Sequence, residues 1–144
     1  MPPTTIAIAA DHAGYALKRA LVAVLADMGC LVVDLGTEGE ASVDYPDFAD
    51  RLVAALSRSE AGAGVLVCGS GIGMSIAANR HPGIRAALCG TVEMARLARQ
   101  HNDANVLVLG ARLIDAETAS ACLGAFLATP FDGGRHARRV AKLA

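Results

Sequence analysis

The sequence predicts an α/β fold: one domain, spanning residues 1–144, built as a Rossmann-like three-layer α/β/α sandwich around a five-stranded parallel sheet. Five short apolar runs alternate with segments whose apolar residues recur every three or four positions. Uninterrupted apolar runs are typical of parallel strands that helices cover on both faces. Apolar residues make up 53% of the chain and aromatic residues only 3%, so the core must consist of Ala, Val, Leu and Ile.

Composition excludes several classes of protein. The 13 basic and 14 acidic residues give a net charge of −1, which provides no field for holding a nucleic acid. The longest apolar run covers residues 20–26, far short of the roughly 20 residues that cross a bilayer. The N-terminal residues lack the basic segment of a secretory signal. We therefore expect a cytoplasmic protein that binds neither membrane nor nucleic acid, with four free thiols.

The first half of the chain reads as strand, helix, strand, loop and helix. The expected ranges are 5–9, 15–28, 31–35, 36–44 and 45–59. Gly29 follows the first helix, at the position of a left-handed C-terminal cap. Asp44 and Pro46 are typical of the N-cap and first turn of the second helix.

The second half continues the alternation. Strands are expected at 65–67, 86–88 and 106–109, and helices at 75–79, 92–100 and 115–128. Thr91 precedes the middle helix as an N-cap. Pro130 and the pair Gly133-Gly134 then break the pattern, before a basic helix or tail at about 131–144.

In a doubly wound sheet the ligand site lies beyond the carboxyl ends of the strands. The residues that follow strands are therefore the informative ones. They are Asp11-His12, 68–73, Cys89-Gly90-Thr91 and Gly110-Ala111-Arg112.

Residues 68–73 form the most unusual segment. Gly69, Gly71 and Gly73 alternate with Ser70 and Ile72, which leaves backbone N–H groups uncovered before a helix and makes an anion nest. The spacing departs from the dinucleotide fingerprint, and the Lys of a P-loop is missing. A cysteine phosphatase loop is excluded because Met74 stands where its Arg would be.

Cys68 lies at the junction of strand and glycine-rich segment. N–H groups and the helix dipole there favour its thiolate, so it is a candidate base or nucleophile, or simply a buried cysteine.

The other candidates have simpler explanations from sequence alone. His101 ends a helix and could complement its C-terminal dipole. Asp11 and His12 could merely satisfy a turn. Arg135 and Arg139 lie four residues apart and could clamp a phosphate, or belong to a solvated tail.

Six segments in the same order resemble the ribose-5-phosphate isomerase B family, which includes galactose-6-phosphate isomerase subunits. These segments are Ala9–Gly14, Asp44–Asp47, Cys68–Asn79, Gly83–Ala86, Arg99–Asn105 and Gly133–His136. The resemblance implies an aldose–ketose isomerase that needs no metal and no cofactor. It would interconvert ribose 5-phosphate and ribulose 5-phosphate through an enediolate.

The resemblance also implies roles for single residues. His101, helped by Asp11, would open the sugar ring, and Cys68 would move the proton between C2 and C1. The amides from Gly69 to Gly73 would hold the enediolate oxygen, with Ser70 as a proton relay. Some members lack the cysteine and carry Glu where this chain has Met74.

The expected substrate contacts fall into two groups. His12, Arg112, Arg135 and Arg139 would bind the phosphate. Tyr45 and Asn102 would contact the sugar. The family assembles each site from two chains, so we expect a homodimer or a dimer of dimers in which the basic segment 131–144 reaches the partner subunit.

Two alternatives remain open at this stage. The substrate could be another aldose phosphate with four or six carbons, because the sequence does not reveal the length of the pocket. The chain could also be a non-catalytic module that binds a phosphosugar, although such a module needs neither Cys68 nor His101.

Overall fold

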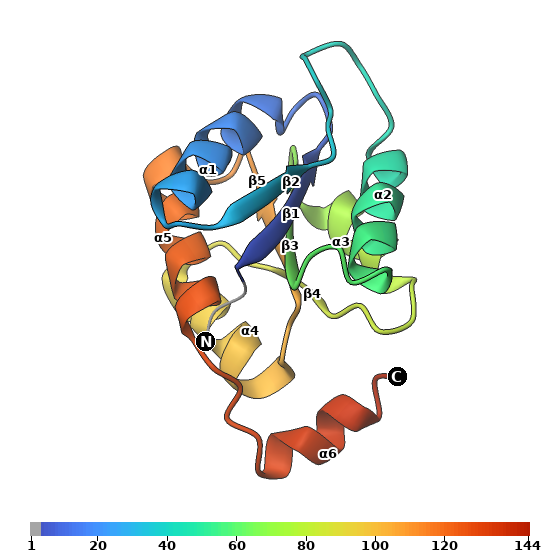
Figure 1. The fold of residues 1–144 in the computed structure, drawn as a ribbon, viewed down its shortest axis with the longest axis vertical. Helices are drawn as coiled ribbons and strands as arrows, with labels where there is room; N and C mark the ends of the chain where they lie inside the picture. The colour runs from blue at the N-terminus through green and yellow to red at the C-terminus, as the bar shows by residue number, and fades with distance from the viewer. Residues whose placement is uncertain (1–3) are drawn as a thin grey trace.

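A computed structural model describes residues 4–144 and shows a parallel sheet between two layers of helices (Figure 1). The strands are β1 (Thr5–Ala10), β2 (Leu31–Asp34), β3 (Ala63–Cys68), β4 (Ala86–Leu88) and β5 (Val106–Gly110). The helices are α1 (Tyr15–Asp27), α2 (Tyr45–Ser57), α3 (Ile72–Asn79), α4 (Val92–Asn102), α5 (Ala116–Ala128) and α6 (Arg135–Ala141). The predicted α/β/α sandwich is therefore confirmed. None of these helices has the length and apolar character that crossing a bilayer requires.

The strand order is β2-β1-β3-β5-β4, and every neighbouring pair is parallel. The chain leaves β1 in one direction to form β2 and then returns to the other side of β1 to form β3. The connections after β1 and β3 therefore diverge, which opens a crevice at their carboxyl ends. This crevice is where a ligand site is expected.

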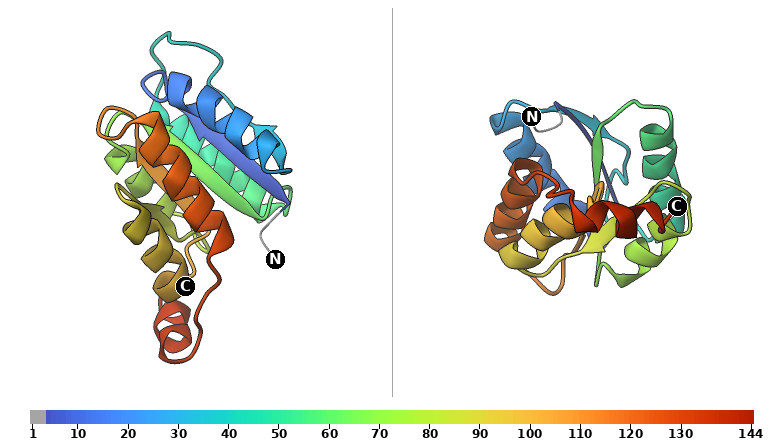
Figure 2. Two further views of the ribbon diagram at one scale, coloured as in Figure 1. Left: turned by 90° about the vertical axis from the view of Figure 1, so that its left-hand side faces the viewer. Right: turned by 90° about the horizontal axis from the view of Figure 1, so that it is seen from below.

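Helices cover both faces of the sheet (Figure 2). Alternate residues of each strand face opposite helical layers. On one face, Ile6, Ile8, Val65 and Val67 pack with apolar residues of α1, α4 and α5. On the other face, Ala7, Ala9 and Leu66 pack with apolar residues of α2 and α3. Cys68 belongs to this second face, so its side chain lies on the same side of the sheet as α3.

Most predicted element boundaries lie within two residues of the observed ones. Helix α3 begins at Ile72, three residues earlier than predicted, because Gly71 adopts φ of 79° and acts as its N-cap. Thr91 caps α4 as expected, with its hydroxyl accepting from the N–H of Met94 at 3.1 Å. Asp44 occupies the N-cap position of α2 but makes no side-chain capping bond. The first helix was expected to reach Met28, which instead lies just beyond the last helical residue and is exposed.

A buried ion pair joins helix α1 to the end of strand β2. The side chain of Lys18 on α1 is 1% exposed, and its ammonium donates to both carboxylate oxygens of Asp34 at 2.6 and 2.8 Å. Asp34 Oδ1 also accepts from the N–H of Gly36 at 3.0 Å. Gly36 is bonded in turn to Ala10 at the end of β1. The ion pair therefore fixes the start of the 35–44 loop beside the carboxyl end of β1.

We predict that the two partners of this ion pair respond unequally to substitution. Asp34→Ala leaves a buried ammonium without a counter-ion and should lower the free energy of unfolding by about 3 kcal/mol. Lys18→Met replaces the ammonium with an apolar group of similar length and should cost about 1 kcal/mol or less. Urea denaturation measures both. The double variant is the control, and it should recover most of the stability that Asp34→Ala loses.

Candidate active site

The register of the sheet brings three strand ends together at the carboxyl edge. Ala10 pairs with Val67, so Asp11 and Cys68 follow at the same level on neighbouring strands. Cys68 itself pairs with Gly110, which places Arg112 just beyond it. A cavity of about 320 Å³ opens here, near the lower limit for small-ligand pockets. Its lining consists of Asp11, Tyr45, Cys68, Gly69, Ser70, Gly73, Arg112 and Leu113.

Two glycines let large side chains lie directly on the segment after β3. A Cβ atom at Gly69 would stand 2.9 Å from Arg112 Nη1, and one at Gly73 would stand 2.6 Å from the ring of Tyr45. The N–H of Arg112 also donates to the carbonyl of Gly69 at 2.9 Å. The guanidinium and the phenol ring are thus held against the backbone at the N-terminus of α3, where anions bind favourably.

Ser70, Asp11 and His12 are fixed by local hydrogen bonds. Ser70 Oγ accepts from the N–H of Ile72 at 3.2 Å. Asp11 is buried, and its Oδ1 accepts from the N–H of Gly14 at 3.0 Å. His12 Nδ1 accepts from the N–H of Val43 at 3.1 Å, so in the neutral ring the hydrogen is on Nε2. His12 therefore offers an N–H donor on its other side.

The remaining predicted residues lie around a different cavity. His101, Asn102 and Arg139 line a space of about 300 Å³ together with His136, Val140 and Leu143. His101 and Asn102 end α4, which runs back from the carboxyl edge to the amino edge of the sheet before β5 begins (Figure 1). Helix α4 has 11 residues, and such a helix is about 16 Å long. Within one chain, His101 and Cys68 are therefore at opposite edges of the sheet.

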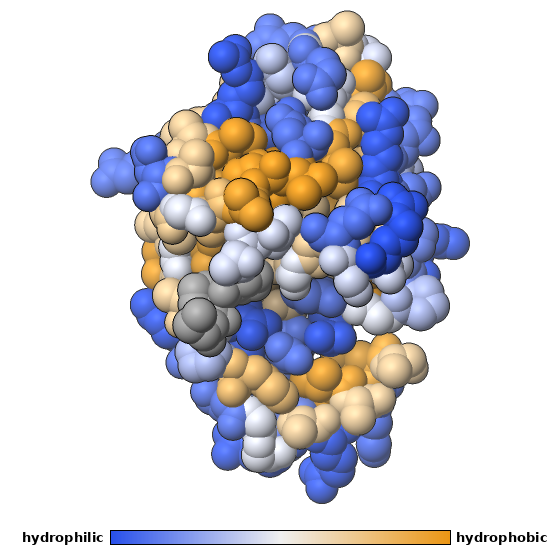
Figure 3. Space-filling model, viewed as in Figure 1, coloured by the Kyte–Doolittle hydropathy of each residue, from blue (hydrophilic) through white to orange (hydrophobic). Residues whose placement is uncertain are grey.

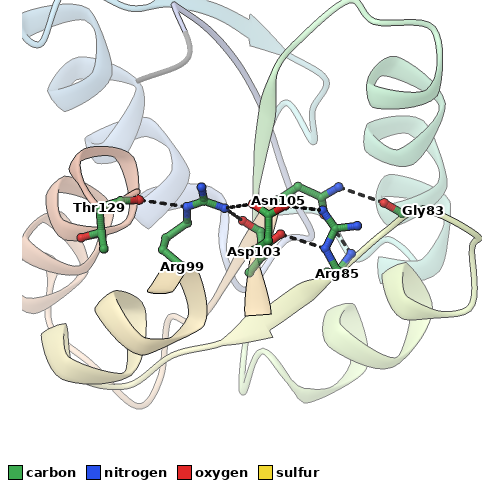
Figure 4. Close-up of polar contacts among 7 residues, drawn as sticks. Gly83, Arg85, Arg99, Asp103, Asn105 and Thr129 are labelled. Carbon is green, nitrogen blue, oxygen red and sulfur yellow. Dashed lines mark hydrogen bonds and ion pairs between the residues drawn. The ribbon is translucent and has the colours of Figure 1, made fainter. Parts of the chain in front are cut away.

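Two arginines fix the end of α4. Arg99 donates to the carboxylate of Asp103 at 2.9 Å and to the carbonyls of Ala104 and Thr129 at 2.7 and 3.1 Å. Arg85 donates to the carbonyl of Asp103 at 2.8 Å (Figure 4). Asp103 adopts φ of 46°, which ends the helix. His101 and Asn102 thus stand on a rigid support.

His101 is stacked on a residue that sequence reasoning did not identify. Its ring lies parallel to that of His136 on α6, with centroids 4.3 Å apart and planes inclined by 12°. Desolvation, and then the positive charges of His101, Arg135 and Arg139, lower the pKa of His136, whereas Asp132 raises it. No local pattern marks this pair, because 34 residues and a turn at Gly133-Gly134 separate the two histidines.

Another cavity, of about 480 Å³, also lies at the amino edge. Arg85, Arg99, Asp103 and Asn105 line it, and these are the groups already bonded to one another in Figure 4. The other walls come from the end of α5 and the residues after it, from Gly62 and Ala63 at the start of β3, and from Ala104. A structural role explains this network, because the Asp103 carboxylate is bonded to both arginines.

The structure therefore divides the predicted site residues into two groups. In the carboxyl-edge group, the residues that line the cavity with Cys68 are Asp11, Tyr45, Gly69, Ser70, Gly73 and Arg112, whereas His12, Gly71 and Ile72 belong to the same segments but do not line it. The amino-edge group contains His101, Asn102 and Arg139, with Arg135 at the start of the same short helix. Cys89 follows β4 but is buried away from both cavities.

A family model described as Ribose/Galactose Isomerase matches residues 6–143. The chain belongs to this family. It is 44% identical to ribose-5-phosphate isomerase B of Escherichia coli over 135 residues, which cover 94% of this chain and 91% of that one. It is 49% identical to a putative sugar phosphate isomerase of Rickettsia bellii over 138 residues, 96% of each chain.

Solved structures of the family have the same fold. The ribose 5-phosphate isomerase of Thermotoga maritima superposes with a TM-score of 0.96 at 56% identity, covering 97% of each chain. That of Anaplasma phagocytophilum superposes with a TM-score of 0.93 at 50% identity, covering 100% of this chain and 99% of that one. The resemblance found in the six sequence segments therefore extends over the whole fold.

We predict that a small alkylating reagent modifies Cys68 faster than the buried cysteines Cys89 and Cys122. Burial, with a smaller effect of Cys122, raises the pKa of the Cys89 thiol to about 12. At pH 8 the Cys89 thiol is therefore almost entirely un-ionised. Burial also raises the pKa of Cys122. Peptide mapping after brief exposure to iodoacetamide should find Cys68 modified well before Cys89 and Cys122, and inorganic phosphate should slow its modification.

The contrary result would be equal labelling of Cys68 and Cys89 in the folded protein. Labelling in urea is the control, and there all four cysteines should react alike.

Proposed function

We propose that this protein is an aldose–ketose isomerase that interconverts ribose 5-phosphate and ribulose 5-phosphate without a metal or other cofactor. The observation that carries the proposal is the placement of Cys68 beside the amide groups of residues 69–73, in the cavity that Asp11 and Arg112 also line. This arrangement provides a base, an oxyanion site and a cation in one small pocket. Membership of the isomerase family supports the same reaction.

Cys68 is the base of the proton transfer in this proposal. Its thiolate takes the proton from C2 of the open-chain aldose, and the electron pair moves to the carbonyl oxygen at C1, which forms the enediolate. A proton passes from the C2 hydroxyl to that oxygen, and the thiol returns its proton to C1. Ser70, which lines the cavity, relays the proton between the two oxygens.

The segment after Cys68 stabilises the enediolate. The N–H groups of residues 69–73 precede and begin α3, so the helix dipole and the amides act together on a developing negative charge. Met74 is fully buried in the core beneath this segment. It holds the glycine-rich turn against the sheet and takes no part in proton transfer.

Ring opening needs a proton acceptor and a proton donor in addition to Cys68. We assign it to His101, which takes the proton of the anomeric hydroxyl and gives a proton to the ring oxygen, with Asp11 assisting. Because Cys68 and His101 lie at opposite edges of one chain, a complete site needs the partner subunit's His101. The phosphate is then held by His12 and Arg112 of one chain and by the partner subunit's Arg135 and Arg139, while Tyr45 and the partner subunit's Asn102 contact the sugar.

Exposed apolar residues indicate how two copies meet. Ile72 and Ile76 lie four residues apart on α3 and are 53% and 60% exposed. A two-fold axis that packs α3 against α3 in antiparallel directions places the carboxyl edge of each copy beside the amino edge of the other. A band of apolar residues also runs over the C-terminal helix in the lower part of the face in Figure 3. Leu143, just beyond that helix, is 63% exposed.

These features support a homodimer, or a dimer of dimers, in which residues 131–144 reach across to the partner subunit. No side chain of α6 is buried within its own chain, which suits a helix that completes a neighbour's site. The four free thiols suit a reducing, cytoplasmic environment.

The direct test is an assay of the purified protein against aldose phosphates of four, five and six carbons, with and without a chelator. Ribose 5-phosphate should give the highest kcat/KM, and the chelator should leave the rate unchanged. Preference for a six-carbon phosphate would reject the substrate assignment. Turnover of none of them, with phosphosugar binding intact, would indicate a binding module.

We predict that Cys68→Ala loses isomerisation and the exchange of the C2 hydrogen with solvent, by at least about 10³-fold. Its affinity for a phosphorylated sugar acid should stay within a few fold, because the arginine and backbone contacts remain. Cys68→Ser should be nearly as poor, since a hydroxyl is too weakly acidic to act as this base. Cys30→Ala is the matched control and should keep full activity. Exchange of C2 hydrogen at the wild-type rate in Cys68→Ala would place the base elsewhere, with Asp11 as the next candidate.

His101→Asn should separate ring opening from isomerisation. Ribose 5-phosphate is mainly cyclic, so its turnover should fall by roughly 10²-fold or more. Erythrose 4-phosphate is too short to close a furanose ring through a free hydroxyl, and its turnover should change little. The comparison uses kcat on both substrates for each variant. Equal losses on the two sugars would contradict the assigned role.

A further inference from the structure

Three side chains at the amino edge converge although the proposed reaction uses only one of them. One ligating atom each from His101, Asp132 and His136 can be chosen so that all three lie within 4.8 Å of one another. His101 ends α4, Asp132 lies in the segment before α6, and His136 is the second residue of α6. No step of the proposed isomerisation involves Asp132 or His136.

The backbone holds these three residues in place. The N–H of Asp132 donates to the carbonyl of Gln100 at 3.0 Å, which ties the segment to the last turn of α4. Gly133 and Gly134 adopt φ of 67° and 54° and turn the chain back. The N–H of His136 then donates to the carbonyl of Gly133 at 3.0 Å, and its ring stacks on that of His101. Convergence of the three side chains thus follows from the fold of the segment.

We propose that His101, Asp132 and His136 bind a divalent transition-metal ion of the zinc, cobalt or nickel type. Two imidazoles and one carboxylate are donors that such ions prefer, whereas magnesium and calcium prefer oxygen ligands. Imidazole nitrogens bind zinc at about 2.0–2.1 Å, so two ligands of one tetrahedral ion lie about 3.3 Å apart. The ligating atoms reach this separation when the two stacked rings move apart at one side and the exposed Asp132 side chain rotates toward them.

Nearby charges set the strength of this site. Asp132 contributes the single negative charge, and Arg135 and Arg139, on the same helix as His136, repel a cation. Asp132 should therefore be the residue on which affinity depends most. The ion keeps an open coordination position, as in sites with three protein ligands.

Bound metal should inhibit the isomerase, a consequence that rests on the role proposed for His101. An imidazole nitrogen that coordinates a metal cannot accept or donate a proton, so ring opening stops while the ion is bound. The metal is therefore a reversible inhibitor of a reaction that itself needs none, and a chelator should restore the full rate.

The binding test uses zinc and cobalt alone, with the purified full-length chain. Zinc in competition with a chromophoric chelator should bind once per chain, and cobalt should give a spectrum without a thiolate charge-transfer band. Asp132→Asn and His136→Ala should each weaken zinc binding by at least about tenfold. His81→Ala is the matched control: His81 contacts Asp50 at 2.9 Å elsewhere on the surface, and its loss should leave the affinity unchanged.

Equal zinc affinity in wild type, Asp132→Asn and His136→Ala would overturn the site, as would a cobalt–thiolate band. The activity test compares wild type with Asp132→Asn. Without zinc, the variant should turn over ribose 5-phosphate at the wild-type rate. Its half-inhibition should need at least about tenfold more zinc. Zinc that binds at these residues without slowing ribose 5-phosphate turnover would confirm the metal site. The same result would reject the role of His101 in ring opening, so the two proposals fail separately.

Discussion

Chain direction is the constraint on which the whole site depends. In a parallel sheet every strand ends at one edge, and every connecting helix returns to the other. Cys68 ends a strand and His101 lies in the last turn of a helix, so the fold itself holds them at opposite edges. No adjustment of a side chain spans a helix of 11 residues. An isomerase that needs both residues in one pocket must therefore take one of them from a second copy.

At the carboxyl edge, the geometry of the site depends on how closely side chains can approach the backbone. Gly69 and Gly73 have no side chain. The Arg112 guanidinium and the Tyr45 ring can therefore lie against the segment that carries the amide groups. The buried pair Lys18–Asp34 fixes the neighbouring loop, and Val43 from that loop orients His12. Stability and site geometry are thus coupled through a loop that touches β1 at one end and His12 at the other.

Sequence reasoning predicted the parts of this arrangement that depend on local pattern. The strands, the Thr91 cap and the position of Cys68 follow from periodicity and from residues next to one another in the chain. Burial of Lys18 on α1 could not be predicted, because it depends on an ion pair with Asp34 at the end of β2. The contact of His136 with His101 depends on the positive φ angles of Gly133 and Gly134. The division of the site between two edges follows from topology, which the residue pattern alone did not reveal.

Mixing two inactive variants tests the shared site most directly. Cys68→Ala and His101→Asn are each expected to be inactive on ribose 5-phosphate. Refolded together in equal amounts, half of the dimers combine both chains, and each of these contains one intact site and one doubly altered site. Activity should therefore return to about a quarter of the wild-type rate. If the mixture stays as inactive as its components, although mass spectrometry shows that mixed dimers have formed, each site belongs to a single chain and the account is wrong.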